Sequence, residues 1–102
     1  MIMEGVFAVA RFVEKPDRAT AETYLEQGYF WNSGNFAFRA DVLMGEFEAF
    51  EPRIASSARA CIAGAATAGS VVRLEPAAFA AAPKISLDYA VMERTSLAAV
   101  VP

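Results

Sequence analysis

The sequence predicts an α/β fold in which helices cover a mixed or parallel sheet. Two apolar runs, at residues 6–13 and 97–101, contain no interior glycine or proline, as expected of buried strands. Amphipathic stretches with helix-capping residues lie between these runs. Strands that are separated by helices imply parallel pairing through crossover connections, which gives the α/β class.

The first predicted elements are a strand and a short helix. Residues 6–13 combine aliphatic and aromatic side chains with a single charge, which is typical of a strand buried on most of both faces. Asp17 can cap a helix from Arg18 to Gln27. Gly28 supplies the left-handed residue that ends such a helix.

The middle of the chain predicts a second strand and two helices. Residues 36–38 have the aromatic density of a strand, and Asp41 is a capping candidate for the helix that follows. Pro52 is suited to the first turn of a third helix. The apolar positions of the second helix recur at i, i+4 and i+7, namely Leu43, Phe47 and Phe50.

The last third of the chain predicts shorter elements. Residues 71–74 can form an extended segment, and residues 75–83 are alanine-rich with two prolines, so they are helical for at most two turns. Ser86 can cap a last helix from Leu87 to about Arg94. Residues 97–101 then return as a buried strand.

The predicted sheet is small for its class. Parallel strands need cover on both faces, and about three strands is at the lower end of the range for sheets. We therefore expect neighbouring strands to lie outside these 102 residues. Exposed sheet edges would then pair with a second copy, which predicts a homodimer or a higher assembly.

Composition excludes several kinds of function. The chain has no histidine, which excludes a Ser-His-Asp triad, a Cys-His pair and a histidine-ligated zinc. Its 9 Lys and Arg against 12 Asp and Glu form no basic cluster, so no nucleic-acid partner is expected. Residues 60–72 are too few to span a bilayer, which needs ~20 residues, so no membrane partner is expected either. A single cysteine and a start without secretory features predict a cytoplasmic location.

Glu14 and Lys15 are the first candidate binding residues. They stand where the first predicted strand ends, and ligands of α/β sheets collect at the carboxyl ends of strands. A carboxylate can accept hydrogen bonds from neighbouring sugar hydroxyls, and an ammonium group can meet a phosphate. An exposed turn before a proline would have the same two residues.

Asn32, Ser33 and Gly34 form the second candidate. They offer an amide with donors and acceptors, a hydroxyl, and a glycine that lets a ligand approach the backbone. The same residue types are also common in ordinary turns. Asp88 is a third candidate, although a carboxylate in the first turn of a helix also stabilises that helix.

Three motifs in this order and spacing resemble the bacterial mannose-1-phosphate guanylyltransferases, including the forms fused to a mannose-6-phosphate isomerase domain. The resemblance runs from about Val9 to Val101. The motifs are Phe12-Val13-Glu14-Lys15-Pro16-Asp17, Trp31-Asn32-Ser33-Gly34 and Ile85-Ser86-Leu87-Asp88-Tyr89-Ala90-Val91-Met92-Glu93.

The resemblance implies a partial Rossmann-like nucleotidyltransferase (GT-A-like) domain. Residues 1–102 would be its C-terminal, sugar-phosphate-binding part, without the N-terminal nucleotide-binding half. The implied reaction transfers GMP from GTP to mannose 1-phosphate and yields GDP-mannose and pyrophosphate. It would require Mg²⁺, whose ligands are expected outside this part, so the 102 residues alone would contain no catalytic or metal-binding residue and would be inactive.

The resemblance also implies roles for individual residues. Glu14 and Lys15 match contacts to the sugar phosphate, and Asn32 with its two successors matches contacts to the sugar hydroxyls. The role of Asp88 within its motif stays open between ligand contact and helix organisation. The implied substrate-binding residues are Glu14, Lys15, Asn32, Ser33, Gly34 and Asp88.

Two alternatives remain at this point. Glu-Lys-Pro also occurs in related sugar-1-phosphate nucleotidylyltransferases, so the substrate could be glucose 1-phosphate with a uridylyl or thymidylyl donor. The second alternative is a catalytically inert module that self-associates through its sheet edges.

Overall fold

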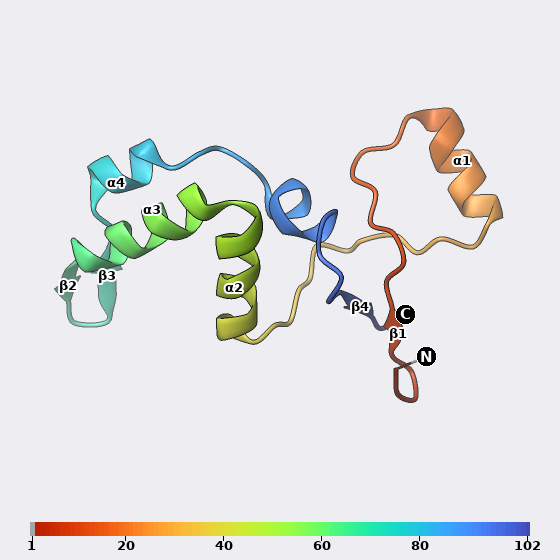
Figure 1. The fold of residues 1–102 in the computed structure, drawn as a ribbon, viewed down its shortest axis with the longest axis horizontal. Helices are drawn as coiled ribbons and strands as arrows, with labels where there is room; N and C mark the ends of the chain where they lie inside the picture. Colours follow the sequence, from red (N-terminus) through yellow and green to blue (C-terminus); the bar gives the residue numbers. More distant parts are fainter. Residues whose placement is uncertain (1) are drawn as a thin grey trace.

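The structure is a computed structural model that describes residues 2–102. It contains short helices joined by long extended segments, with two very small sheets (Figure 1). In chain order the elements are β1 (Phe7–Ala8), α1 (Arg18–Glu26), α2 (Ala40–Phe50), α3 (Pro52–Ala63), β2 (Ala66–Ala68), β3 (Val71–Arg73), α4 (Pro76–Ala81), the π-helical turn η1 (Asp88–Met92) and β4 (Ala99–Val100).

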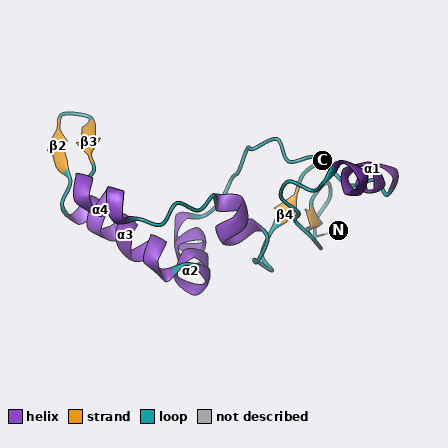
Figure 2. Ribbon diagram, turned by 90° about the horizontal axis from the view of Figure 1, so that it is seen from above, coloured by secondary structure: helices purple, strands orange, loops and turns teal. Residues whose placement is uncertain are grey.

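The molecule is elongated. Helices α2, α3 and α4 gather at one end with the β2–β3 hairpin at their tip, and α1 lies at the other end (Figures 1 and 2). Strands β1 and β4 and the turn η1 lie between them. The radius of gyration is 16.9 Å, whereas a compact domain of this length has about 13 Å.

The predicted parallel sheet is wrong for residues 2–102, because both sheets there are two-stranded and antiparallel. Strand β1 pairs with β4 in the register Phe7 with Val100, which brings the two ends of the chain side by side. Strands β2 and β3 are joined by two residues, Gly69 and Ser70. A connection that short can only make an antiparallel hairpin, and Gly69 provides the positive φ of 60°.

The predicted strands are shorter than expected. Residues 6–13 form a strand only at Phe7–Ala8, and residues 97–101 only at Ala99–Val100. Residues 36–38 form no strand, and Phe38 is 60% exposed. A strand needs a partner for its backbone groups, and residues 36–38 have none among the described residues.

Helix α1 confirms its prediction almost to the residue. The Asp17 carboxylate accepts a hydrogen bond from the Thr20 backbone at 2.7 Å, and Gly28 has a φ of 78°. This hydrogen bond lowers the pKa of Asp17. Its contribution to stability is therefore present at neutral pH and is lost as the pH falls through that lowered pKa.

Aromatic contacts fix α1 against the segment that leads to Glu14. The rings of Tyr24 and Tyr29 stack with centroids 4.2 Å apart. The Arg11 guanidinium lies 5.8 Å from the centroid of the Tyr24 ring and donates a hydrogen bond to the Tyr24 hydroxyl at 3.3 Å. Such a stacked cation adds a modest stabilisation.

Helices α2 and α3 form as predicted, with one correction. Arg39 occupies the cap position of α2, so Asp41 lies inside the first turn, where its carboxylate pairs with Arg39 at 2.8 Å. A carboxylate there still interacts favourably with the helix N-terminus. Pro52 begins α3 as predicted, and an ion pair between Arg59 and Glu48 links the two helices.

The last predicted helix is a π-helical turn, η1, instead of an α-helix over 87–94. The expected cap at Ser86 is present, since its hydroxyl accepts a hydrogen bond from the Tyr89 backbone at 3.2 Å. The backbone N–H of Glu93 donates to the carbonyl of Asp88 at 3.0 Å, which is an i to i+5 bond. No helix in the described part of the chain is long and apolar enough to cross a membrane.

The core is small. Only four apolar residues of the described chain are buried, and they come from α3 and η1: Ala55, Cys61, Ala90 and Val91. The accessible surface is 7698 Å², against roughly 5,600 Å² for a compact protein of this mass. Apolar side chains such as Phe36 and Leu97 account for part of the excess, with 37% and 62% exposure.

A substitution of Gly64, the residue that follows α3, can test how α3 packs against the start of α4. A Cβ atom at Gly64 would lie 2.8 Å from Cγ and 3.0 Å from Cβ of Glu75. Glu75 has little freedom to move, because its carboxylate caps α4 by accepting hydrogen bonds from Ala77 and Ala78. We expect Gly64→Ala to lower the free energy of unfolding by about 1–3 kcal/mol, as measured by urea denaturation.

Gly45→Ala in α2 is the matched control. Nothing lies within 4 Å of a Cβ at that position, and alanine favours a helix by about 1 kcal/mol over glycine. Gly45→Ala should therefore stabilise the chain. Equal effects of the two substitutions would contradict the packing of α3 against Glu75.

Candidate functional site

Three segments that are distant in the sequence meet at η1. The Asn32 side-chain amide donates a long hydrogen bond of 3.5 Å to the Asp88 carboxylate. The backbone N–H of Glu14 donates to the Glu93 carboxylate at 2.7 Å. The carboxyl groups of Glu14 and Asp88 are close enough for Asp88 to raise the pKa of Glu14. Thus Glu14 and Asn32, which the sequence suggested separately, each lie near Asp88.

Local hydrogen bonds shape the Asn32 turn. The side-chain oxygen of Asn32 accepts a hydrogen bond from the Gly34 backbone at 2.9 Å, and Gly34 has a φ of 80°. The Ser33 hydroxyl accepts one from the Asn35 amide at 3.1 Å. This arrangement leaves the Asn32 amide with one further N–H and one oxygen lone pair for another partner. The turn is therefore fixed in shape while its amide still has hydrogen-bonding capacity.

Lys15 lies in a left-handed backbone conformation. Its φ is 48°, and it is the one residue other than glycine with a positive φ in the described chain. A conformation of this kind costs an ordinary residue roughly 1–2 kcal/mol. Its side chain is exposed, and its positive charge opposes the rise in the pKa of Glu14. The ammonium group thus belongs to the same electrostatic site but is free to reach a ligand from outside.

The electrostatics of this site raise the pKa of Glu14 above its ordinary value of 4.5. Partial desolvation is the largest cause of the raised pKa, followed by the negative charge of Asp88 and a hydrogen bond with Asp88. The positive charge of Lys15 lowers the pKa, and the negative charge of Glu93 raises it slightly. Several carboxylates around one ammonium group can accept hydrogen bonds from a polyhydroxylated ligand.

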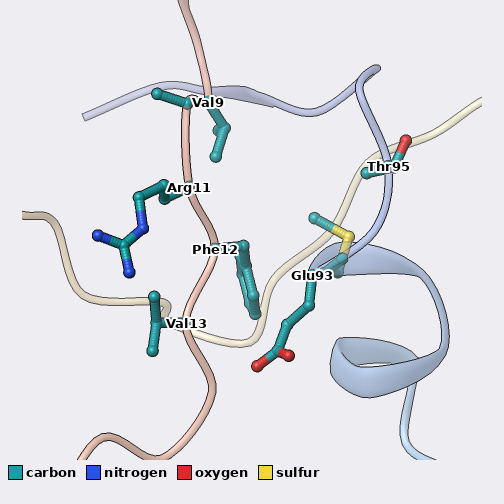
Figure 3. A pocket seen from close by; sticks show the side chains of 8 residues that line it. Val9, Arg11, Phe12, Val13, Glu93 and Thr95 are labelled. Atoms are coloured by element: carbon teal, nitrogen blue, oxygen red, sulfur yellow. The ribbon is translucent and has the colours of Figure 1, made fainter.

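Two cavities lie near the candidate residues. The first, of about 320 Å³, lies between residues 9–13 on one side and Met92, Glu93 and Thr95 on the other (Figure 3). The side chains of Phe12 and Glu93 lie on one side of the backbone of residues 9–13, and the side chain of Arg11 lies on the other side (Figure 3). The second, of about 280 Å³, lies between residues 35–38, α2, η1 and residues 95–99. The candidate carboxylates Glu14 and Asp88 line neither cavity.

Residues 93 and 94 are part of this arrangement although the sequence interpretation assigned them no role. Glu93 contacts the backbone of Glu14. Arg94 donates hydrogen bonds to the Phe50 carbonyl at 2.9 Å and to the Glu51 carboxylate at 3.1 Å, which ties η1 to the junction of α2 and α3. The spacing of five between Asp88 and Glu93 would have indicated a shared face only if a π-helical turn had been expected.

The residues of the site do not fit a metal centre. Residues 2–102 contain no group of three or more Cys, Asp or Glu residues arranged to hold a metal ion. The Glu93 carboxylate is moreover engaged by the Glu14 N–H. We therefore assign no step of any reaction to a metal held by these residues.

The proximity of Asp88 to Glu14 can be tested by titration. We expect Asp88→Asn to lower the pKa of Glu14 toward its ordinary value, because a neighbouring negative charge is removed. The pKa is read from the Glu14 side-chain carboxyl ¹³C shift as a function of pH. Because folding raises this pKa, the group favours the folded state at low pH, and that contribution is lost as the pH rises through the raised value.

Asp41→Asn in α2 is the control, since Asp41 pairs with Arg39 and is not among the groups that shift Glu14. An unchanged Glu14 pKa in Asp88→Asn would mean that the two carboxyl groups do not meet.

Known proteins are similar in sequence to this chain. The Nucleotidyl transferase family model matches residues 1–75. Xanthan biosynthesis protein XanB of Xanthomonas campestris pv. campestris (strain B100) is 50% identical over 99 residues, which cover 96% of this chain and 21% of that protein. Mannose-1-phosphate guanylyltransferase of Sinorhizobium fredii is 45% identical over 99 residues, which cover 96% of this chain and 19% of that protein.

The mannose-1-phosphate guanylyltransferase of Escherichia coli (strain K12) is 43% identical over 97 residues, which cover 94% of this chain and 20% of that protein. The chain thus spans about a fifth of the length of these relatives. No solved structure matches it. With more than half of its residues matched by the family model, the chain belongs to the nucleotidyl transferase family.

Proposed function

We propose that this chain is the sugar-phosphate-binding part of a mannose-1-phosphate guanylyltransferase. The reaction transfers GMP from GTP to mannose 1-phosphate and releases pyrophosphate. Relatives with that name are 43% and 45% identical to nearly the whole chain. The observation that carries the proposal is the meeting of Glu14 and Asn32 at Asp88, because it joins the three motifs in one polar site.

Each side chain has a task in this proposal. The Glu14 carboxylate and the Asn32 amide bind hydroxyl groups of the sugar, and Lys15 binds the phosphate. Asp88 orients the Asn32 amide through their hydrogen bond, and the backbone of Ser33 and Gly34 lies against the sugar. Phosphoryl transfer depends mainly on alignment and charge neutralisation, so residues that hold the sugar phosphate contribute by positioning the nucleophile.

The nucleotide side of the reaction lies outside these residues in this proposal. The nucleotide-binding half and the Mg²⁺ ligands are contributed by the rest of the enzyme, and residues 1–102 alone are inactive. Two facts support this division: the chain covers about a fifth of its relatives, and its surface exceeds that of a compact protein by roughly 2,000 Å².

The test uses the full-length protein that carries this segment. With GTP and equal amounts of mannose 1-phosphate and glucose 1-phosphate, we expect mannose 1-phosphate to be consumed preferentially. Glu14→Gln and Asn32→Ala should each raise KM for mannose 1-phosphate about tenfold or more and leave KM for GTP nearly unchanged. The loss of one hydrogen bond to the ligand costs about 1–2 kcal/mol of binding free energy, which corresponds to a change in KM of about tenfold.

Glu26→Gln, at the exposed end of α1, is the control and should change neither KM. Preferential use of glucose 1-phosphate with UTP or dTTP would replace the proposed substrate by the related one. Unchanged KM values in both Glu14 and Asn32 variants would contradict the assigned site.

We also propose assembly through the exposed edges of the β1–β4 pair. A two-stranded sheet leaves an unpaired edge on each side, and Phe7 in β1 is 39% exposed. Light scattering of the purified chain should give at least twice the mass of one copy, and Phe7→Lys should lower it. A monomeric mass at high concentration would contradict this assembly, and an inert module would assemble without any turnover in the full-length protein.

A further inference from the structure

We infer that Glu93 is a positioning residue that holds the Glu14–Lys15 turn in its binding conformation. This inference rests on the proposed function. The Glu93 carboxylate accepts a hydrogen bond from the backbone N–H of Glu14 at 2.7 Å, across 79 positions of sequence. A backbone N–H donated to a carboxylate is one of the stronger hydrogen bonds in proteins.

The turn has few other restraints. Among the hydrogen bonds of residues 2–102, the bond to Glu93 is the one that engages the backbone between residues 10 and 16. The same turn contains Lys15 in a left-handed conformation, with a φ of 48°. A strained residue keeps its conformation only where the surroundings restrain it. The hydrogen bond that the Glu14 N–H donates to Glu93 supplies that restraint directly beside the strained residue.

The π-helical turn explains why Glu93 can do this. Its i to i+5 hydrogen bond joins Glu93 to Asp88, so residues five apart lie one above the other. Asp88 contacts Asn32 while Glu93 contacts the backbone of Glu14. Arg94 anchors the end of the turn to Phe50 and Glu51. One short turn therefore sets the distance between the two loops that carry the proposed sugar contacts.

The geometry also distinguishes this role from that of a ligand-binding carboxylate. One oxygen of Glu93 is engaged by the Glu14 N–H. Its hydrogen bond acts directly on the backbone N–H of Glu14, so we assign it an effect on backbone position. An uncharged side chain with an oxygen at the same place makes a weaker bond but should still hold the turn in position.

The test compares Glu93→Ala with Glu93→Gln in the full-length protein. Glu93→Ala removes the acceptor and should raise KM for mannose 1-phosphate about tenfold, with KM for GTP unchanged. Glu93→Gln keeps an acceptor oxygen and should stay within about threefold of the wild type. Glu93→Asp keeps the charge but shortens the side chain, so it should resemble Glu93→Ala. Glu26→Ala is the matched control on α1 and should leave both KM values unchanged.

A second measurement does not depend on turnover. Exchange of the Glu14 amide hydrogen with solvent should be slowed in the wild type and in Glu93→Gln, and fast in Glu93→Ala. If Glu93→Ala fails to fold, the contrast between Glu93→Asp and Glu93→Gln in the same two measurements decides the question.

The outcomes separate the two proposals. A wild-type protein that turns over no sugar phosphate would refute the proposed function, while amide exchange would still test the hydrogen bond. A wild-type protein that is active, with equal KM values in Glu93→Ala and wild type, would overturn the inference. Equal loss in Glu93→Gln and Glu93→Ala would also overturn it, because charge rather than position would then be the cause.

Discussion

The hydrogen bonds made by η1 and by the two residues that follow it, Glu93 and Arg94, are the constraint on which the site depends. Through Asp88 the turn holds Asn32, and through Glu93 it holds the backbone of Glu14. Through Arg94 it is fixed to the α2–α3 junction. The segments that it joins have few contacts with each other, and the sheets are too small to orient them. Without this turn the two loops would be connected only through long extended segments.

Helices α1 and α3 could be predicted from the sequence because their signals are local. Asp17 and Gly28 mark the ends of α1, and Pro52 marks the start of α3, within one residue of the structure. Strands carry no comparable signal, since their existence depends on a partner segment. Residues 36–38 have a strand-like composition, but no segment of the described chain pairs with them. The prediction of a parallel sheet was wrong for the same reason, because the sequence does not show which segments pair.

The site could be predicted in part. Residue type and order pointed to Glu14, Asn32 and Asp88, and the structure brings these three together. Their functional roles stay predictions. Glu93 belongs to the third motif but its role was not predicted, because a spacing of five places two residues on different faces of an α-helix and the sequence of η1 does not indicate a π-helical turn. The contact of Glu93 is moreover with a backbone N–H, which no residue type reveals.

The large exposed surface has a consequence for the interpretation of variants. The four buried apolar residues of the described chain contribute little burial free energy against the entropy of ordering it, so whatever covers the exposed surface adds to the stability of the ordered chain. Ordering and docking are then thermodynamically coupled. Substitutions of Phe36 or Leu97 would act on the amount of protein that escapes degradation in the cell, and leave the affinity of the surviving molecules for sugar phosphate intact.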